Sequence, residues 1–419
     1  MDEPVAADPV AAVSAVLDRR QVRTVFQPLV HLVDAEVVGY EALSRGPEGS
    51  AVEDPLLLLD AARRAGRLEE LDWLCAAAAS HTAHGARLHP SMTIFLNFKP
   101  ETLMGPYPED MADDIRRARS QLRIVVEIDE EDLRCAPAVA LQAASRARAD
   151  GWGVALDNVG ATPVSLALLP VLHPDVVKLD LRLLAEHRDQ DAAEIETAVR
   201  TYAEMSGAAV LAQRVESDED ILSARAFGAT YGQGWRYGRP GPLTADRHVP
   251  LAPFGLLRTP EIGLVPTPFE VVSRQRESAP TERRMLDRIT SVIEHRAVTN
   301  GAPTVLLACV HDAAHLDSAT RVAYRDLARQ ASFTAVFGAH MSGVDLADVH
   351  VVDLAPTEPL CREWNLIVVG PNYSGALVAR DRGEGGEGAH HRYDHIVTHD
   401  RELVVQAARS VLRWIGRQG

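Results

Sequence analysis

Six short apolar segments of this chain each end on a polar side chain, and this pattern restricts the possible folds more than any other feature. The segments end on Glu41, Asn97, Glu127, Asp157, Lys178 and Gln213. Continuous apolar runs of this length are typical of strands buried on both faces, as in a parallel sheet. Amphipathic stretches lie between several of them, at residues 56–67, 137–148 and 192–203. Such strand–helix alternation predicts an α/β fold, which closes most naturally into a TIM-like (β/α) barrel.

The polar strand ends also predict a functional site. In (β/α) barrels the active site is built at the carboxyl ends of the strands, so we expect these side chains to converge on one cleft. Only Lys99 and Lys178 are lysine among the 43 basic residues. Lysine is a compact amine with a tunable pKa, and arginine does not replace it in proton transfer. We therefore interpret Lys178 as a functional amine and Lys99 as a chance survivor, and the cleft as a metal or phosphate site.

A family resemblance rests on these same residues. Glu41-Ala42-Leu43 lies within residues 39–45 and follows Phe26-Gln27-Pro28-Leu29. Asn97, Glu127 and Lys178 come next in order, and the series closes with residues 231–235 and 237–240. The set spans residues 20–243 and resembles the EAL domain, the phosphodiesterase module of bacterial cyclic di-GMP signalling. A lone Glu-Ala-Leu would mean little, but a collinear set of this length is specific.

The resemblance implies a role for each residue. A first Mg²⁺ or Mn²⁺ would be held by Glu41, Asn97, Glu127 and Asp157. The attacking water would be oriented or deprotonated by Lys178, with support from Glu216 and Gln233. The cyclic dinucleotide would be bound by Gln27, Leu43 and Arg45. Two divalent ions about 4 Å apart can supply the nucleophile, neutralise phosphate charge and stabilise the leaving oxygen, and hard cations of this kind take oxygen ligands.

The second-metal side departs from the family pattern. Asn158 and Gln213 stand where the family has carboxylates, and Arg214 stands where it has glycine. Two negative charges are thus missing from a site that must hold a second 2+ ion. The loop at residues 159–164 also carries Pro163, which fixes a backbone dihedral where the family loop is flexible. These departures predict metal at the first site only and lost or much reduced catalysis.

The chain divides into four parts by composition. We expect an N-terminal lead-in at 1–20, the EAL-type barrel at 21–245, a proline-rich linker at 246–268 and a smaller α/β domain at 269–419. The last part resembles the DICT domain, a sensory module. This resemblance rests on Leu327-Ala328 followed by Phe333, on Pro359-Leu360-Cys361-Arg362-Glu363-Trp364, and on Ala379-Arg380-Asp381.

The net charge and the spacing of the cysteines limit which binding partners and which cellular compartment we expect. The formal net charge of −16 argues against nucleic acid, because a phosphate backbone is repelled wherever basic residues do not cluster. The four cysteines show no CxxC spacing, and we expect them to be reduced. No signal peptide or membrane span is evident, so we expect a cytoplasmic protein. The resemblance further implies a homodimer, and the C-terminal domain is a candidate contact for a protein partner.

Three functions remain open from the sequence. The leading hypothesis is a bacterial signalling protein whose degenerate EAL domain binds cyclic di-GMP, or a related signal, with weak or no hydrolysis and is coupled to a sensory domain. The first alternative is an active metal-dependent cyclic di-GMP phosphodiesterase in which Glu216 and waters complete the second site. The second alternative is a protein–protein adaptor that binds no nucleotide.

Overall fold

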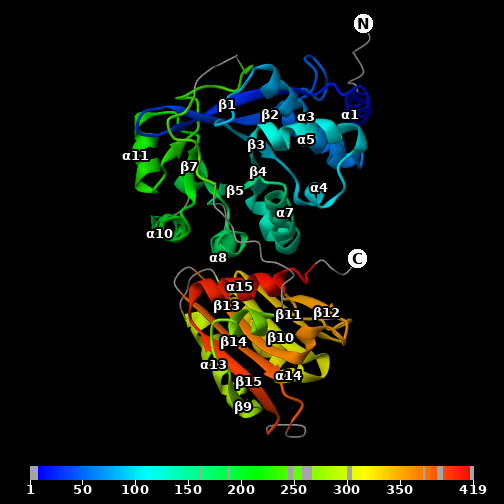
Figure 1. Ribbon diagram of the computed structural model, residues 1–419, viewed down its shortest axis with the longest axis vertical. Helices are drawn as coiled ribbons and strands as arrows, with labels where there is room; N and C mark the ends of the chain where they lie inside the picture. The colour runs from blue at the N-terminus through cyan, green and yellow to red at the C-terminus, as the bar shows by residue number, and fades with distance from the viewer. Residues whose placement is uncertain are drawn as a thin grey trace. The chain divides into compact units, whose positions relative to one another are not determined.

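A computed structural model describes most of the chain and divides it into two compact units. The described residues are 8–160, 163–186, 189–243, 249–256, 267–299, 304–370, 373–384 and 390–415. The first unit comprises residues 1–161 and 174–258, and the second comprises residues 162–173 and 259–419. Figure 1 shows the first unit in blue to green and most of the second in yellow to red.

The first unit is a closed eight-stranded barrel. Its strands are β1 (Arg23–His31), β2 (Val37–Arg45), β3 (Thr93–Asn97), β4 (Arg123–Asp129), β5 (Gly153–Val159), β6 (Val176–Asp180), β7 (Ala209–Gln213) and β8 (Tyr231–Gly232). All six apolar segments of the sequence form strands, and all six steps from β2 to β8 are parallel pairs. The TIM-like barrel is therefore confirmed.

Strand β1 departs from the all-parallel sheet that the apolar runs predict. It pairs antiparallel with both β2 and β8. Only five residues, 32–36, connect β1 to β2. A connection this short joins antiparallel neighbours, because a parallel pair needs a crossover of about a dozen residues or more. The direction of β1 therefore follows from the length of its hairpin loop.

Helices surround the barrel strands. They are α1 (Pro9–Asp18), α2 (Pro55–Arg64), α3 (Leu68–Gly85), α4 (Pro100–Met104), α5 (Ala112–Gln121), α6 (Glu130–Cys135), α7 (Pro137–Ala149), α9 (Leu181–Glu186), α10 (Asp189–Ser206) and α11 (Asp218–Ala226). Local sequence sets several of their starts. Asp54 caps α2 by accepting hydrogen bonds from two backbone N–H groups, and Ser217 and Asp220 form a reciprocal capping box at α11.

The barrel interior is apolar below the polar strand ends. One cluster of buried side chains fills it: Leu29, Val38, Phe95, Val125, Ala155, Val176, Leu211 and Phe254. Phe254 lies within the segment that the sequence analysis interprets as a linker, and its ring stacks on Tyr231 at a centroid distance of 4.0 Å. Phe95 and Asn97, like Val125 and Glu127, are two residues apart on one strand and so face the same way. A polar layer therefore lies directly above the apolar one.

The second unit is a seven-stranded mixed sheet in the order β12-β11-β10-β13-β14-β15-β9. Its strands are β9 (Ala279–Glu282), β10 (Val305–Asp312), β11 (Phe333–Ala339), β12 (His350–Leu354), β13 (Glu363–Val369), β14 (Ser374–Asp381) and β15 (Arg392–Thr398). Its helices are α8 (Pro163–Leu172), α12 (Pro268–Ser273), α13 (Arg283–Thr299), α14 (Ser318–Ala328) and α15 (Arg401–Leu412). The expected smaller α/β domain is thus present.

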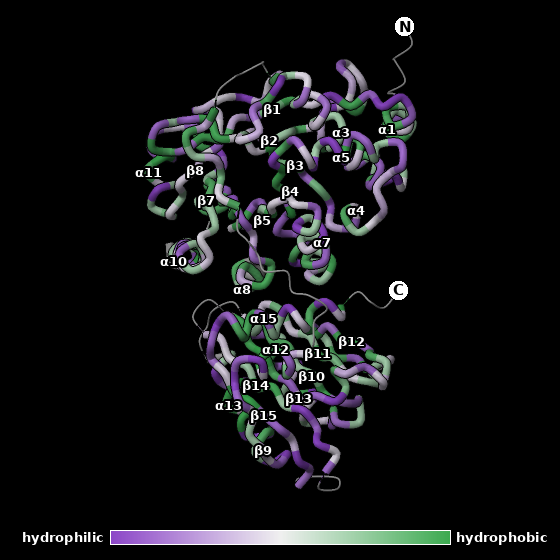
Figure 2. Tube along the Cα trace, viewed as in Figure 1, coloured by the Kyte–Doolittle hydropathy of each residue, from purple (hydrophilic) through white to green (hydrophobic). Residues whose placement is uncertain are grey.

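Helices pack on both faces of this sheet. Leu286 of α13 and Leu327 of α14 join one buried cluster with Leu306 and Leu366, while α12 and α15 contact β13 and β14. Figure 2 shows α8 almost entirely hydrophobic, whereas α10 is largely hydrophilic. Consecutive residues of the central strands, such as Leu306 and Leu307, are both buried although they point to opposite faces. Burial on both faces explains why β10 reads as a continuous apolar run.

Strands β9 and β15 and the short helix α12 are not expected from the sequence pattern. Strand β9 contains Pro280 and is exposed or half-buried, and β15 alternates irregularly between exposed and buried residues. Edge and near-edge strands of this kind lack the apolar signal that identifies central strands. Among the described residues, no helix is long and apolar enough to span a membrane.

Candidate functional site

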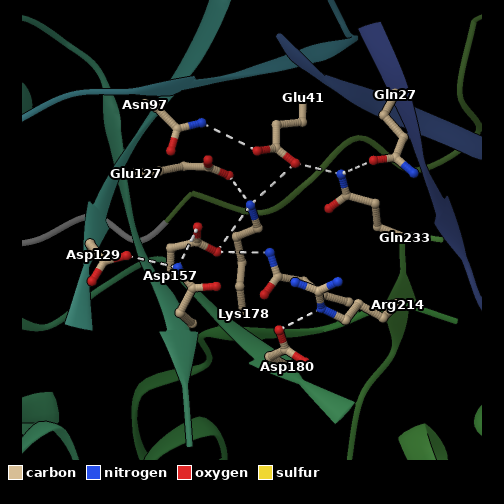
Figure 3. Close-up of polar contacts among 12 residues, drawn as sticks. Gln27, Glu41, Asn97, Glu127, Asp129, Asp157, Lys178, Asp180, Arg214 and Gln233 are labelled. Atoms are coloured by element: carbon tan, nitrogen blue, oxygen red, sulfur yellow. Dashed lines mark hydrogen bonds and ion pairs between the residues drawn. The ribbon is translucent and has the colours of Figure 1, made fainter. Parts of the chain in front are cut away.

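Strand register brings the polar strand ends of the barrel into one cluster. Four pairs of site residues are direct neighbours across adjacent strands: Gln27 with Glu41, Asn97 with Glu127, Asp129 with Asp157, and Asp180 with Gln213. Figure 3 shows Glu41, Glu127 and Asp157 converging around the amine of Lys178, with Gln27, Asn97, Asp129 and Asp180 farther out. The predicted convergence of the strand ends on one place is therefore present in the structure.

Lys178 stands at the centre of what we call the lysine side of the cluster, made of Glu41, Asn97, Glu127 and Lys178. The Lys178 side chain is fully buried, and so is that of Glu127. The Nζ atom of Lys178 forms an ion pair with Glu127. It lies 3.2 Å from Oδ1 of Asp157 and 3.6 Å from Oε2 of Glu41. A buried amine is stable here because three carboxylates compensate for its lost hydration.

The carboxylates of the cluster differ in proton affinity. Burial, together with the nearby charge of Glu41, raises the pKa of Glu127 well above its usual value despite Lys178. Burial also raises the pKa of Asp157, although Lys178 opposes the effect. For Glu41 the burial penalty is outweighed by Lys178 and by hydrogen bonds from Gln233 and Asn97, so its pKa is lowered. The pKa of Lys178 is raised because the three carboxylates outweigh its burial.

Amide side chains tie the lysine side to the first strands. Asn97 donates from Nδ2 to Oε1 of Glu41 over 3.2 Å. Gln233 donates from Nε2 to Oε2 of Glu41 and to Oε1 of Gln27, the latter over 3.0 Å. Gln27 in turn donates from Nε2 to the carbonyl oxygen of Gly238 over 3.1 Å. Both glutamines are thus held in fixed orientations beside Glu41.

The opposite side of the cluster is built differently, and we call it the amide side: Asp129, Asn158, Asp180, Gln213 and Arg214. Asn158 Nδ2 donates to Oδ2 of Asp129 over 2.7 Å, and Gln213 Nε2 donates to Oδ1 of Asp157 over 2.9 Å. Arg214 Nε donates to Oδ2 of Asp180 over 2.7 Å. Each carboxylate on this side therefore faces a donor that the chain itself supplies, and Asp157 joins the two sides.

Two residues of the amide side have left-handed backbones. Asn158 has φ of 57° and Arg214 has φ of 60°. Asparagine tolerates this region because its short side chain bonds locally, but for arginine the conformation is unfavourable. Backbone strain of this kind persists only where surrounding structure enforces it, and it concentrates at functional sites.

A cavity of about 290 Å³ opens beside the lysine side. Glu41, Leu43, Arg45 and Asn97 line it together with apolar residues of α2 and α3, including Leu58 and Leu71. Arg45 donates from Nη1 to the carbonyl oxygen of Ser44 over 2.8 Å. The volume lies at the low end of the range for small-molecule sites, and a mostly apolar lining with a few polar groups is typical of them.

Two sequence expectations fall outside the cluster. Glu216 is exposed, and its backbone N–H donates to Asp220 at the start of α11; no contact described for it reaches the cluster. Its expected supporting role in catalysis thus lacks the geometry seen for Gln233. In the loop at 159–164, residues 161 and 162 lie outside the described residues, and Pro163 begins α8.

Asp129 and Asp180 also belong to the cluster, although no role is expected for either from the sequence. Asp129 lies two residues after Glu127 on β4, and Asp180 lies two residues after Lys178 on β6. Residues i and i+2 of a strand face the same way. This spacing is the signal that would have placed both aspartates beside the predicted site.

The two sides differ in how well they suit a divalent cation. On the lysine side the oxygens of Glu41, Asn97, Glu127 and Asp157 are the kind of donors that Mg²⁺ and Mn²⁺ take, and Oε2 of Glu127 is buried without a hydrogen-bond partner. Carboxylates on both sides face donors of the chain, but on the amide side Asn158 and Gln213 are neutral and Arg214 adds a positive charge. Within the described ranges, no group of three acids, histidines or cysteines is already spaced for a metal. The residue types therefore fit one cation, on the lysine side, and do not fit a second.

Several known proteins are similar to about half of this chain. An uncharacterized signaling protein of Caulobacter vibrioides is 31% identical over 225 residues, covering 52% of this chain and 27% of that protein. The Probable cyclic di-GMP phosphodiesterase PdeB of Escherichia coli is 28% identical over 234 residues, covering 54% and 44%. This chain spans less than half the length of these curated relatives. The crystal structure of the Xanthomonas citri FimX EAL domain in complex with c-diGMP has a TM-score of 0.48 and 20% identity, covering 59% of this chain and 96% of that one.

Family comparison covers both units. Residues 272–382 match the family described as a sensory domain in diguanylate cyclases and two-component systems, abbreviated DICT. Residues 10–240, more than half of the chain, match the EAL domain family. Both resemblances seen in the sequence are therefore confirmed, and the chain belongs to the EAL domain family, with a DICT sensory domain after the barrel.

Proposed function

We propose that this protein acts in cyclic di-GMP signalling, and that its barrel binds cyclic di-GMP but hydrolyses it weakly or not at all. Its relatives include a protein named as a probable cyclic di-GMP phosphodiesterase, which supports the choice of ligand. The preserved lysine side and the adjoining cavity support binding. The altered amide side argues against efficient turnover.

One observation carries the proposal. Asn158 and Gln213 point their amide nitrogens at Asp129 and Asp157, over 2.7 Å and 2.9 Å. A neutral amide brings no negative charge to a cation, and its N–H group is a donor that cannot ligate one. Two positions that would need anionic oxygens for a second ion are therefore occupied by donors that satisfy the neighbouring carboxylates. Without the second ion, neutralisation of the phosphate and activation of water at that side are lost.

Ligand binding is assigned to the other side of the cluster. We propose that Arg45 contacts a phosphate through charge-assisted hydrogen bonds, that Gln27 and Leu43 contact the nucleotide, and that the cavity of about 290 Å³ takes an apolar face of it. Glu41, Asn97, Glu127 and Asp157 would hold one Mg²⁺ or Mn²⁺, which would supply phosphate charge neutralisation when bound. Lys178 and Gln233 are kept as candidate catalytic residues, because they lie in this same cluster.

Titration calorimetry and a turnover assay on the full chain test the proposal. Cyclic di-GMP is titrated with Mg²⁺, with Mn²⁺ and with chelator, and the same samples are assayed for the linear dinucleotide. Binding with little or no turnover is expected. Rapid turnover would establish the active phosphodiesterase, which the intact lysine side favours as the second candidate. Absence of binding under all three conditions would leave a protein–protein adaptor as the remaining candidate function.

The remaining assignments concern the context of the barrel. We propose a reducing, cytoplasmic compartment, which the four free cysteines support. We also propose that two copies of the chain pair, and that the DICT domain senses a signal or contacts a partner protein. Light scattering with and without cyclic di-GMP tests the pairing, because a monomer under both conditions contradicts it.

A further inference from the structure

We infer that Arg214 is a phosphate-binding residue that takes the place of the second cation, so that the barrel binds a phosphodiester without divalent metal on its amide side. The inference rests on the proposed function, in which the barrel binds cyclic di-GMP. It follows from the disagreement between the amide side and a second metal ion. The residues there supply positive charge and N–H donors, which are groups that recognise a phosphate directly.

The contacts of Arg214 leave most of its donors available. Among the described residues, its guanidinium contacts Asp180 through Nε, over 2.7 Å. An arginine guanidinium has five N–H donors in a planar fork that matches two phosphate oxygens at once. With Nε committed to Asp180, the terminal nitrogens remain for a ligand. Figure 3 shows the guanidinium beside Asp180 at the edge of the cluster.

Arg214 and Asp180 differ in burial, and this difference leaves the positive charge of Arg214 accessible to a ligand. The side chain of Asp180 is only 6% exposed, whereas that of Arg214 is 54% exposed. Asp180 is itself fixed, because its Oδ1 accepts hydrogen bonds from the backbone N–H groups of Arg182 and Leu183 at the start of α9. A buried, immobile carboxylate therefore holds a guanidinium that still reaches solvent. Preorganisation of this kind lowers the entropy lost on binding.

The backbone conformation of Arg214 also supports a functional role. Its φ of 60° lies in the region that glycine adopts freely and that L side chains disfavour. An arginine in this conformation is strained, and this one follows directly on the end of β7, inside the cluster. Gln213, the residue before it, is meanwhile fixed on Asp157, which sets the direction of the chain at this turn. An observed backbone outlier at such a place supports a functional reading.

The charges around Arg214 explain why the ligand needs it. Asp129, Asp157 and Asp180 supply negative charge on this side, and Lys178 is already surrounded by Asp157, Glu41 and Glu127. A phosphodiester anion approaching these carboxylates is repelled unless a cation stands between them. Arg214 is the cation that the amide side offers within the described residues, since the other donors there, Asn158 and Gln213, are neutral.

Calorimetry with cyclic di-GMP in chelator tests the inference on the full chain. Wild-type protein is compared with Arg214→Gln, with Arg214→Lys and with the control Arg182→Gln. Arg182 is a matched control because it is exposed, pairs with Glu186 and follows Asp180 closely in sequence. We expect Arg214→Gln to weaken binding in chelator at least about tenfold, Arg214→Lys to recover part of the loss, and Arg182→Gln to change affinity less than about twofold. The loss should shrink at high salt, which screens an exposed charge.

The outcomes separate this inference from the proposed function. Equal affinities of wild type and Arg214→Gln in chelator would overturn the inference alone. If wild-type binding requires Mg²⁺ or Mn²⁺, which an ion on the lysine side accounts for, the same variants are compared with that metal present, and equal affinities of wild type and Arg214→Gln there overturn the inference while the proposed ligand stands. No binding with or without metal would overturn the proposed function and this inference with it. Circular dichroism and urea unfolding of each variant identify any loss of affinity that comes from misfolding.

Discussion

The lysine side and the amide side of the barrel cluster contain carboxylates in similar numbers but compensate for their charge differently. On the lysine side one amine, Lys178, faces Glu41, Glu127 and Asp157. On the amide side each carboxylate has a donor of its own: Asn158 for Asp129, Gln213 for Asp157 and Arg214 for Asp180. Each side keeps one buried oxygen without a hydrogen-bond partner, Oε2 of Glu127 and Oε1 of Gln213, but the first belongs to a carboxyl group and the second to a neutral amide. A cation therefore gains more on the lysine side.

The largest expected effect is on the lysine side. Lys178→Met leaves a group of buried carboxylates without their cation and should lower the free energy of unfolding by about 3–5 kcal/mol near pH 8. Burial and the Glu41 charge raise the pKa of Glu127, so its unfolded form releases a proton from about pH 4.3 upward while the folded form retains it. Stability thus falls as pH rises through this window, and the loss should be smaller at pH 5.

Urea unfolding at both pH values measures this effect. Lys99→Met is the matched control, because Lys99 is partly exposed and pairs with Asp132 over 2.9 Å. Its loss should stay within about 1 kcal/mol, as for other exposed or partly exposed ion pairs. Similar losses for the two lysines would mean that Lys178 is not the shared counter-charge of the cluster.

The second largest effect is expected from a double variant that makes the amide side able to bind a metal ion. Asn158→Asp with Gln213→Glu places new carboxylates against Asp129 and Asp157, so the double variant should lose about 2–4 kcal/mol of stability in chelator. Mn²⁺ should restore this stability and bring hydrolysis of cyclic di-GMP. The single variants should recover little turnover, because a half-built site under-neutralises the ion and neighbouring sites are not additive.

Unfolding and turnover with and without Mn²⁺ provide the measurements, and Gln121→Glu at the exposed end of α5 is the control. Wild-type turnover as fast as that of the double variant would show that the amides do not silence the site. A double variant that is stabilised by Mn²⁺ yet remains inert, even with Arg214→Gly added, would shift the explanation to the loop at residues 159–164.

A smaller effect concerns the ligand cavity beside the lysine side. Arg45→Ala removes a cation that lines the cavity and should weaken cyclic di-GMP binding about tenfold, which is about 1.4 kcal/mol. Arg64→Ala, an exposed residue of α2 paired with Asp60, is the control and should leave affinity unchanged. Calorimetry that gives the same constant for Arg45→Ala and wild type would remove Arg45 from the binding site.

The smallest effect separates stability from binding on the amide side. Arg214→Gly relieves a left-handed backbone conformation, which costs about 1–2 kcal/mol for an L side chain. It also removes a donor from Asp180, whose side chain is only 6% exposed and keeps two backbone donors, and this loss costs about 1–3 kcal/mol. The two effects oppose each other, so the free energy of unfolding should change by less than about 2 kcal/mol. A loss above about 2 kcal/mol in urea would make Arg214 a structural residue rather than a ligand-binding one.

Much of the barrel and of its cluster could be predicted from the chain because both follow from local pattern. The apolar runs ending on Glu41, Asn97 and Glu127 specify buried strands, and the carboxyl ends of parallel strands meet at one rim. The direction of β1 depends on a loop length rather than on strand composition. The contacts of Asn158 and Arg214 depend on side-chain orientation and on φ at single residues, which no periodicity encodes. The edge strand β9 carries too little apolar signal to be seen.

Phe254 limits how the two halves of this protein can be separated for study. Its ring lies among the innermost side chains of the barrel, and its carbonyl oxygen accepts a hydrogen bond from Arg123 at the start of β4. A recombinant barrel that stops at residue 245, after the last family motif, would lack this plug and expose Phe95 and Tyr231 to water. Removing a buried phenylalanine side chain alone destabilises a core by about 3–5 kcal/mol. An isolated barrel should therefore extend at least through residue 256.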